Sequence, residues 1–234
     1  MTDYYLVIDT EASGLPQNWS LPFSADNNWP HAVQISWLIY GPEKQVIKKA
    51  DHYIRNNGLV ISPSAIDIHG ITPEFLSNNG VGLEPVLDEL TADINQYSPL
   101  LIGHFIRLDY YILSAEFYRL GKENPLVKIP VFCTMQASEQ LHWNNTSRQL
   151  HLTELYRLLF NTEPKNPHNS LYDAEATAAC FFELLNRREI TDENLLQQNK
   201  DSQNWRIPGT VKPAGCMPIL WLILLGGLLI YLIV

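Results

Sequence analysis

The chain has 234 residues, a hydrophobic fraction of 46% and a formal net charge of −9. This acidity excludes a protein that coats nucleic acid through charge alone, but it allows a nucleic-acid enzyme whose acidic site is neutralised by metal ions. The three cysteines, Cys133, Cys180 and Cys216, are odd in number and lack metal-ligand spacing, which predicts reduced thiols in a cytoplasmic domain.

The N-terminal part of the chain has the pattern of an antiparallel sheet. Three runs have strand character: Tyr4–Asp9, Ala32–Tyr40 and Val46–Ile54. The segment GPEKQ between the last two is typical of a hairpin turn. The first two runs are separated by the loop 14–32, which is long for a compact scaffold and therefore of interest for function. Its aromatic residues either form a small core that pins the loop or stack on bases: Trp19, Phe23 and Trp29.

Helical and strand patterns alternate in the following part of the chain. Helices are expected at Glu84–Tyr97, Asp109–Leu120, Met135–His142, Leu150–Phe160 and Ser170–Arg187. The short apolar runs SPLLIGH and KIPVFCT lie between them and are typical of strands buried on both faces. An antiparallel start followed by this alternation predicts an α/β domain with a mixed sheet flanked by helices, over residues 1–188.

The C-terminal part differs in composition from this domain. Residues 189–216 are polar, with Pro and Gly increasing along the segment, which predicts a linker containing a short helix near Asp192–Gln198. Residues 217–234 contain no charged residue. At about 1.5 Å per residue they would reach roughly 27 Å, close to the hydrocarbon thickness of a thin bilayer. We therefore expect a C-terminal transmembrane helix, which would make the chain a single-pass, tail-anchored membrane protein with its domain in the cytoplasm.

Carboxylates occur at the ends of three predicted elements. Asp9 and Glu11 end the first strand, and their spacing places both on one face. Asp109 begins one helix, and Asp173 lies at the start of another, five residues after His168. Each acidic residue alone is compatible with ordinary helix capping or a strand end. Together they would repel one another unless they hold cations, and oxygen ligands favour two Mg²⁺ or Mn²⁺ ions.

The start of the last helix has a local interpretation as well. Ser170 and Asp173 have the spacing of a capping box, in which a hydroxyl accepts from a backbone N–H group of the first turn. A histidine beside the carboxylates, with a pKa near neutrality, is also a suitable general base for a water molecule. The segment thus predicts both a helix start and part of a site.

Three motifs give the chain a resemblance to a known family. DTE after the first strand, HFIRLD after a later strand and HNSLYD at the last helix resemble the exonuclease motifs of the DEDDh 3′–5′ exonucleases. DIHGIT and VFCTM resemble segments between those motifs, so the resemblance covers about residues 3–188. It implies a ribonuclease-H-like fold with two bound ions. The implied metal ligands are Asp9, Glu11, Asp109 and Asp173, with Asp9 bridging both ions. The implied general base is His168.

The resemblance also implies a pocket for the 3′-terminal nucleotide. The candidates for substrate contacts are Thr10, Ser13, Gly14, Leu15 and Phe105. Phe105 stands where the family often has Asn, Leu108 where it usually has Phe, and Ser170 where Ala is common. None of these departures removes a metal ligand, but Phe105 offers no polar contact. The histidines His69 and His104 are expected to be structural.

These features together predict a membrane-tethered, metal-dependent 3′–5′ exonuclease. It would release nucleoside monophosphates from single-stranded nucleic acid or duplex 3′ ends, with DNA favoured over RNA. The alternative is a non-catalytic, membrane-anchored nucleic-acid-binding module. That alternative predicts the loss of a metal ligand or of the histidine, whereas all five residues are present.

Overall fold

The computed structural model describes residues 3–141, 148–203 and 205. Its centre is a five-stranded sheet with the order β3-β2-β1-β4-β5. The strands are β1 (Tyr5–Ala12), β2 (Ala32–Tyr40), β3 (Val46–Tyr53), β4 (Leu100–Gly103) and β5 (Val131–Cys133). The first three pair antiparallel, and β4 and β5 run parallel to β1. The predicted mixed sheet is therefore confirmed.

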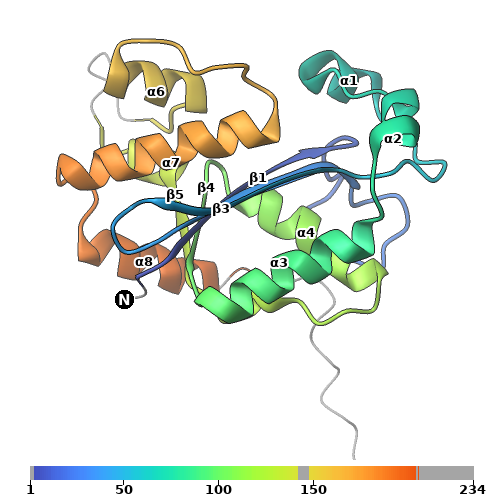
Figure 1. Cartoon of the computed structure of the whole chain (residues 1–234), viewed down its shortest axis with the longest axis horizontal. Helices are drawn as coiled ribbons and strands as arrows, with labels where there is room; N and C mark the ends of the chain where they lie inside the picture. The colour runs from blue at the N-terminus through green and yellow to red at the C-terminus, as the bar shows by residue number, and fades with distance from the viewer. Residues whose placement is uncertain (1–2, 142–147, 204, 206–234) are drawn as a thin grey trace, which may run out of the picture.

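Helices cover both faces of this sheet (Figure 1). One face packs against α3 (Leu83–Tyr97) and α4 (Arg107–Arg119). The other packs against α6 (Leu152–Phe160) and α7 (Ser170–Asn186), and the short α5 (Thr134–Ser138) follows β5 directly. The two faces carry separate hydrophobic cores because β-strand side chains alternate between them.

This alternation decides where the acidic residues of β1 lie. Leu6 and Ile8 are fully buried in the core beneath α3 and α4. Val7 is fully buried in the core beneath α6 and α7. Asp9 and Glu11 follow Val7 at intervals of two residues, so they project on the α7 side, beyond the point where the apolar core ends.

Two short helices and one 3₁₀ turn were not predicted from the sequence. The helices are α1 (Pro63–His69) and α2 (Pro73–Asn79), and the turn is η1 (Pro125–Lys128). Ser62 caps α1 by accepting from the Ala65 amide, and Thr72 caps α2 in the same way from Phe75. Gly70 ends α1 with a φ of 71°, a left-handed conformation that favours glycine. The α1–α2 pair lies at one end of the molecule (Figure 1).

The aromatic residues of the loop 14–32 form a small core on α4, which confirms one of the two interpretations offered for them. Phe23 and Trp29 are buried with Tyr111 and Ala115, and Trp19 packs against this group. The rings of Trp29 and Tyr111 are stacked with centroids 5.4 Å apart. The Arg119 guanidinium donates to the backbone carbonyl groups of Trp29 and Pro30. These contacts hold the loop in place, although the loop has no helix or strand of its own.

Helix α8 (Asp192–Gln203) begins inside the segment expected to be a linker and is longer than the short helix predicted there. It packs against β5, which is an edge strand of the sheet. The Gln198 side chain accepts from the Cys133 amide at 2.7 Å and donates to the Cys133 carbonyl at 3.2 Å. Gln198 thus replaces a neighbouring strand at this edge.

The expected localisation, that of a single-pass, tail-anchored membrane protein, is contradicted by the lengths and compositions of the helices. Within the residues that the structure describes, no helix combines the length and the apolarity needed to cross a bilayer. The longest of these helices, α7, contains Asp173, Glu175 and Glu183. The segment 217–234, on which the expectation of a membrane anchor rested, lies outside the described residues, as does Cys216.

Candidate active site

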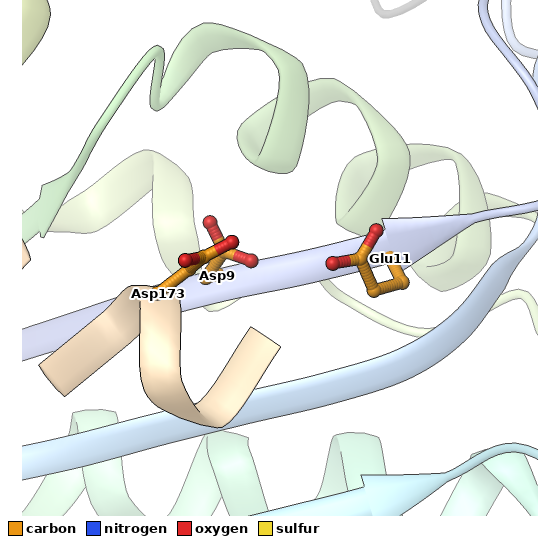
Figure 2. Close-up of side chains that lie close together, drawn as sticks. All are labelled: Asp9, Glu11 and Asp173. Carbon is orange, nitrogen blue, oxygen red and sulfur yellow. The ribbon is translucent and has the colours of Figure 1, made fainter. Parts of the chain in front are cut away.

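Three acidic side chains from two elements converge at the end of the sheet. Figure 2 shows Asp9 and Glu11 projecting from β1 towards the first turn of α7, which carries Asp173. One carboxylate oxygen from each residue lies within 4.8 Å of the others. Burial raises the pKa of Asp9 well above its ordinary value, and the neighbouring carboxylates add to this rise, Asp109 before Asp173 and Glu11. Burial and the charges of Asp173 and Asp109 raise the pKa of Glu11 to about 8.

The fourth carboxylate, Asp109, lies in the first turn of α4 and is 4% exposed. Its Oδ1 atom accepts from the Thr10 amide at 2.8 Å and from the Thr10 hydroxyl at 2.7 Å. Burial raises the pKa of Asp109 to about 7, against the effect of the two Thr10 hydrogen bonds, which favour the charged form. Asp109 is outside the 4.8 Å group, but its charge contributes to the raised pKa of both Asp9 and Glu11.

This donor set fits a divalent cation. The carboxylates of Asp9, Glu11 and Asp173 are half-buried and lie close together, and burial and mutual repulsion favour their neutral forms, as the raised pKa values of Asp9 and Glu11 indicate. A bound cation reverses this preference, because it stabilises the ionised oxygens that burial and repulsion disfavour. Oxygen ligands without sulfur or imidazole favour Mg²⁺ or Mn²⁺.

His168 lies in the loop immediately before α7 and has a left-handed φ of 64°. Its backbone amide donates to Asp173 Oδ2 at 2.9 Å, and its side chain is exposed. Burial raises the pKa of Asp173, against the opposing effects of the His168 backbone hydrogen bond and of the His168 charge. Burial also lowers the pKa of His69, and the charge of His168 adds to this fall. The histidine predicted as general base is therefore beside the acidic group.

The capping-box prediction for Ser170 is wrong, because Asn169 is the N-cap of α7 and makes no side-chain cap bond. Ser170 is instead fully buried, with its Oγ 2.5 Å from Ser36 Oγ. The Asp173 carboxylate binds the His168 amide, so it holds the loop before the helix.

The predicted substrate residues fall into two groups. Thr10 and Ser13 are buried and make internal bonds: Thr10 holds Asp109, and Ser13 Oγ accepts from the His31 amide at 2.9 Å. Leu15 is 72% exposed and, with Gly14, lines a groove of about 1340 Å³ whose lining also includes Glu11, other residues of the loop 14–32 and residues of α1. Phe105 is 39% exposed, has a left-handed φ of 62°, and packs against Trp19.

His69 and His104 have the structural roles that we expected. His69 Nδ1 accepts from the Ile71 amide at 2.9 Å, so its Nε2 donates to the Ala12 carbonyl at 3.3 Å. The Nε2 atom of His104 is 3.0 Å from the Leu150 carbonyl oxygen, and its Nδ1 atom is 2.9 Å from the Thr134 hydroxyl. Both rings join segments that are distant in the sequence.

A model of the exonuclease family known as RNase_T matches residues 6–181, which includes all four carboxylates and His168. The chain belongs to this exonuclease family. Ribonuclease T of Baumannia cicadellinicola subsp. Homalodisca coagulata is 30% identical over 138 residues, which cover 56% of this chain and 62% of that relative. The match therefore spans less than two thirds of the relative's length.

Solved structures share the fold of this exonuclease family member. E. coli exonuclease I in complex with a dT13 oligonucleotide has a TM-score of 0.62 and 20% identity, over 80% of this chain and 41% of that one. The nuclease domain of 3′hExo, a DEDDh family member bound to rAMP, has a TM-score of 0.63 and 16% identity, over 80% and 93% of the two chains. These likenesses show the ribonuclease-H-like exonuclease fold.

A set of polar side chains beside the acidic cluster of this family member was not predicted from the sequence. Gln34 and Ser36 of β2 are fully buried, and both donate to Asp51 Oδ1 at 2.8 Å. A signal was present, because Gln34 and Ser36 are two residues apart in an otherwise apolar strand and share one face. Their register against Asp9 and Glu11 required the strand pairing.

Proposed function

We propose that the chain is a metal-dependent 3′–5′ exonuclease, whose activity resides in residues 1–188 and releases nucleoside monophosphates from nucleic-acid 3′ ends. The observation that carries the proposal is the convergence of Asp9, Glu11 and Asp173, with Asp109 next to them, in a chain of the exonuclease family. Carboxylates that converge from three elements in a partly buried site favour a compensating charge, and phosphodiester hydrolysis by two cations uses such a site.

In this proposal each residue has a defined task. Bound divalent ions supply charge neutralisation for the attacking and leaving oxygens. Asp9, Glu11, Asp109 and Asp173 hold these ions, and Thr10 orients Asp109 through its two hydrogen bonds. An imidazole nitrogen of His168 accepts the proton of the attacking water, and the exposed loop position of this residue gives it access to a bound nucleic-acid end.

The exposed surface beside the acidic group supports contacts with a strand end. Leu15 and Phe105 are exposed apolar side chains, which suit sugar and base contacts. The groove lined by Glu11 and by the loop 14–32 is a suitable path for a single strand or a duplex 3′ end. Structural neighbours include complexes with DNA oligonucleotides and with a histone mRNA stem-loop.

The preference for DNA over RNA expected from the sequence is not retained in this proposal. The curated relative is a ribonuclease T, and the neighbours include a DNA complex and a complex with rAMP. The choice between the two sugars depends on contacts near the 2′ position, so the assay compares both.

The proposal is tested with the full-length chain, Mg²⁺, and single strands of DNA and RNA of one sequence, each labelled at the 5′ end. We expect a ladder that shortens from the 3′ end, together with released nucleoside monophosphates. His168→Ala should reduce the rate about 10²–10⁴-fold, the usual contribution of a general base. Asp9→Asn should reduce it at least as strongly, because it removes a charge from the centre of the cluster.

The matched control is Asp88→Asn, an exposed aspartate of α3 that pairs with Lys122 on the opposite face of the sheet. This variant should keep the parental rate. Equal rates in the parent, His168→Ala and Asp9→Asn would overturn the assigned site. Binding of the labelled strand without any shortening would favour the non-catalytic nucleic-acid-binding module.

A further inference from the structure

The sheet face that carries the acidic cluster also carries polar residues on the neighbouring strands. Two cross-strand rows run from β1 across β2 to β3: Asp9–Ser36–Asp51 and Glu11–Gln34–Tyr53. Directly opposite residues in antiparallel strands project from the same side of a sheet, so both rows face α7. The metal ligands of β1 are therefore the first members of two continuous polar rows.

The first turn of α7 closes these rows into a ring of hydrogen bonds. Ser36 Oγ donates to Asp51 Oδ1 at 2.8 Å, and Gln34 Nε2 donates to the same oxygen at 2.8 Å. Ser36 has one hydroxyl proton and gives it to Asp51, so the Ser170 hydroxyl must donate to Ser36 Oγ, at 2.5 Å. The Ser170 amide donates to Gln34 Oε1 at 3.4 Å, which completes the ring.

Three of the four ring members are fully buried, whereas Asp51 is exposed. Gln34, Ser36 and Ser170 are each 0% exposed, so their polar groups have no access to bulk water. Buried polar groups are costly unless they are paired, and a satisfied buried network fixes one arrangement of its elements. A further hydrogen bond joins the start of α7 to Tyr53, the last residue of the row that begins at Glu11. In this bond Asn169 Nδ2 donates to the Tyr53 hydroxyl at 3.3 Å.

We propose that the ring formed by Gln34, Ser36, Asp51 and Ser170 is a positioning network for the metal centre. Ser170 is one turn before Asp173, and the ring ties this turn to the strand that pairs with β1. It therefore sets the height and rotation at which α7 presents Asp173 to Asp9 and Glu11. Mg²⁺ requires near-ideal octahedral ligand geometry, so a small displacement of α7 would weaken ion binding.

This inference rests on the metal site of the proposed function, but its test measures the affinity for the ion and not the cleavage of nucleic acid. Mn²⁺ is titrated into the full-length chain, and free Mn²⁺ is measured by electron paramagnetic resonance. Ser36→Ala and Ser170→Ala should each weaken Mn²⁺ binding roughly tenfold, the lower range for groups that orient metal ligands. The double variant should bind nearly as well as either single variant, because both substitutions open the same ring.

Ser138→Ala is the matched control. Ser138 is also 0% exposed and helical, and its Oγ donates to the Met135 carbonyl at 2.7 Å and accepts from the Leu150 amide at 2.8 Å. Ser138→Ala therefore removes a buried hydroxyl at a similar cost in stability, but from α5 and outside the ring. We expect its Mn²⁺ affinity to equal that of the parent.

Asp51 supplies a second test that leaves the interior of α7 unchanged. Asp51→Asn keeps an acceptor oxygen for Ser36 and Gln34 and should retain most of the Mn²⁺ affinity, whereas Asp51→Ala should lose roughly tenfold. Parental affinity in Ser36→Ala, Ser170→Ala and Asp51→Ala would overturn the inference. A parent that binds Mn²⁺ without degrading nucleic acid would contradict the proposed function alone, and a parent that binds no Mn²⁺ would contradict both.

Discussion

At the scale of single residues, His104 is a half-buried histidine whose protonation opposes folding. Its Nε2 atom donates to the Leu150 carbonyl and its Nδ1 atom contacts the Thr134 hydroxyl, so the neutral ring is held by both nitrogens. Burial lowers the pKa of His104 to about 4, against a small opposing effect of the Leu150 bond. An unfolded histidine titrates near 6.5, so the unfolded chain binds more protons between these two values.

This difference predicts a loss of stability in acid. The contribution of His104 to the free energy of unfolding is present above pH about 6.5 and is lost as the pH falls towards about 4. Between pH about 7 and 5 the loss from this residue is about 2 kcal/mol. Urea unfolding of the parent and of His104→Gln measures it, because the variant should lose less stability over that interval. Parallel pH profiles in the two proteins would contradict the prediction.

The residues of the candidate site differ in how far the sequence could predict them. Asp9 and Glu11 could be placed on one face because strand side chains alternate, and this needs no tertiary information. The ring partner of Ser170 could not be found, because Ser36 is distant in the chain and meets it only once α7 lies on the sheet. Local spacing suggested a helix cap for Ser170, and a tertiary contact replaced it.

At the scale of elements, the edge of the sheet at β5 depends on one side chain of α8. An uncovered edge strand exposes backbone groups that would pair with other chains, and the Gln198 amide binds both the amide and the carbonyl of Cys133. Helix α8 has no buried residue, so this pair of hydrogen bonds adds to the partly buried packing of Leu195 in attaching the helix.

Gln198→Ala is therefore expected to destabilise the docking of α8. Loss of two hydrogen bonds to a part-buried strand should cost about 1–3 kcal/mol. The readout is hydrogen exchange at the Cys133 amide, which should become faster by roughly 10- to 100-fold. Gln197→Ala is the control, because the Gln197 side chain binds the exposed Asp201 within α8 itself. Equal protection of Cys133 in both variants would show that Gln198 does not hold the edge.

The elements that sequence analysis missed were short and had clear boundary signals. Helices α1 and α2 each begin with a Pro that follows a Ser or Thr N-cap, and each helix is followed directly by a Gly. These are start and stop signals, but seven residues are too few for a convincing apolar periodicity. The central strands were easier to predict because burial on both faces requires continuous apolar runs, as in β4.

At the scale of the whole molecule, the fold class followed from the order of strand and helix patterns, whereas the arrangement of layers came from the structure. The sequence pattern could not show that the loop 14–32 is anchored on α4, since Trp29 and Tyr111 are far apart in the chain. The same limit applies to the groove beside Glu11, which is formed by segments that meet only in the folded protein.

The acidic centre has a consequence for the stability of the complete chain. Four carboxylates lie near one another in a protein whose formal net charge is −9, and the pKa of Glu11 is raised to about 8. The metal-free fold therefore bears an energetic cost at neutral pH that the unfolded chain does not, first from the burial of these carboxylates and then from the repulsion among them. A cation that binds only the folded state removes this repulsion and stabilises the fold by mass action.

We therefore expect Mg²⁺ or Mn²⁺ to raise the melting temperature of the full-length chain. At a concentration about 100 times the dissociation constant the gain is about 2.7 kcal/mol, or roughly 5 °C or more for a chain of this size. Asp9→Asn should melt higher than the parent without metal, because it removes the cost of placing an ionisable carboxylate in this site, and it should lose most of the response to the ions. Differential scanning calorimetry measures both effects, with NaCl of equal ionic strength as the control. A response to Mg²⁺ no larger than the response to NaCl, or an unchanged response in Asp9→Asn, would show that the stabilisation does not come from this centre.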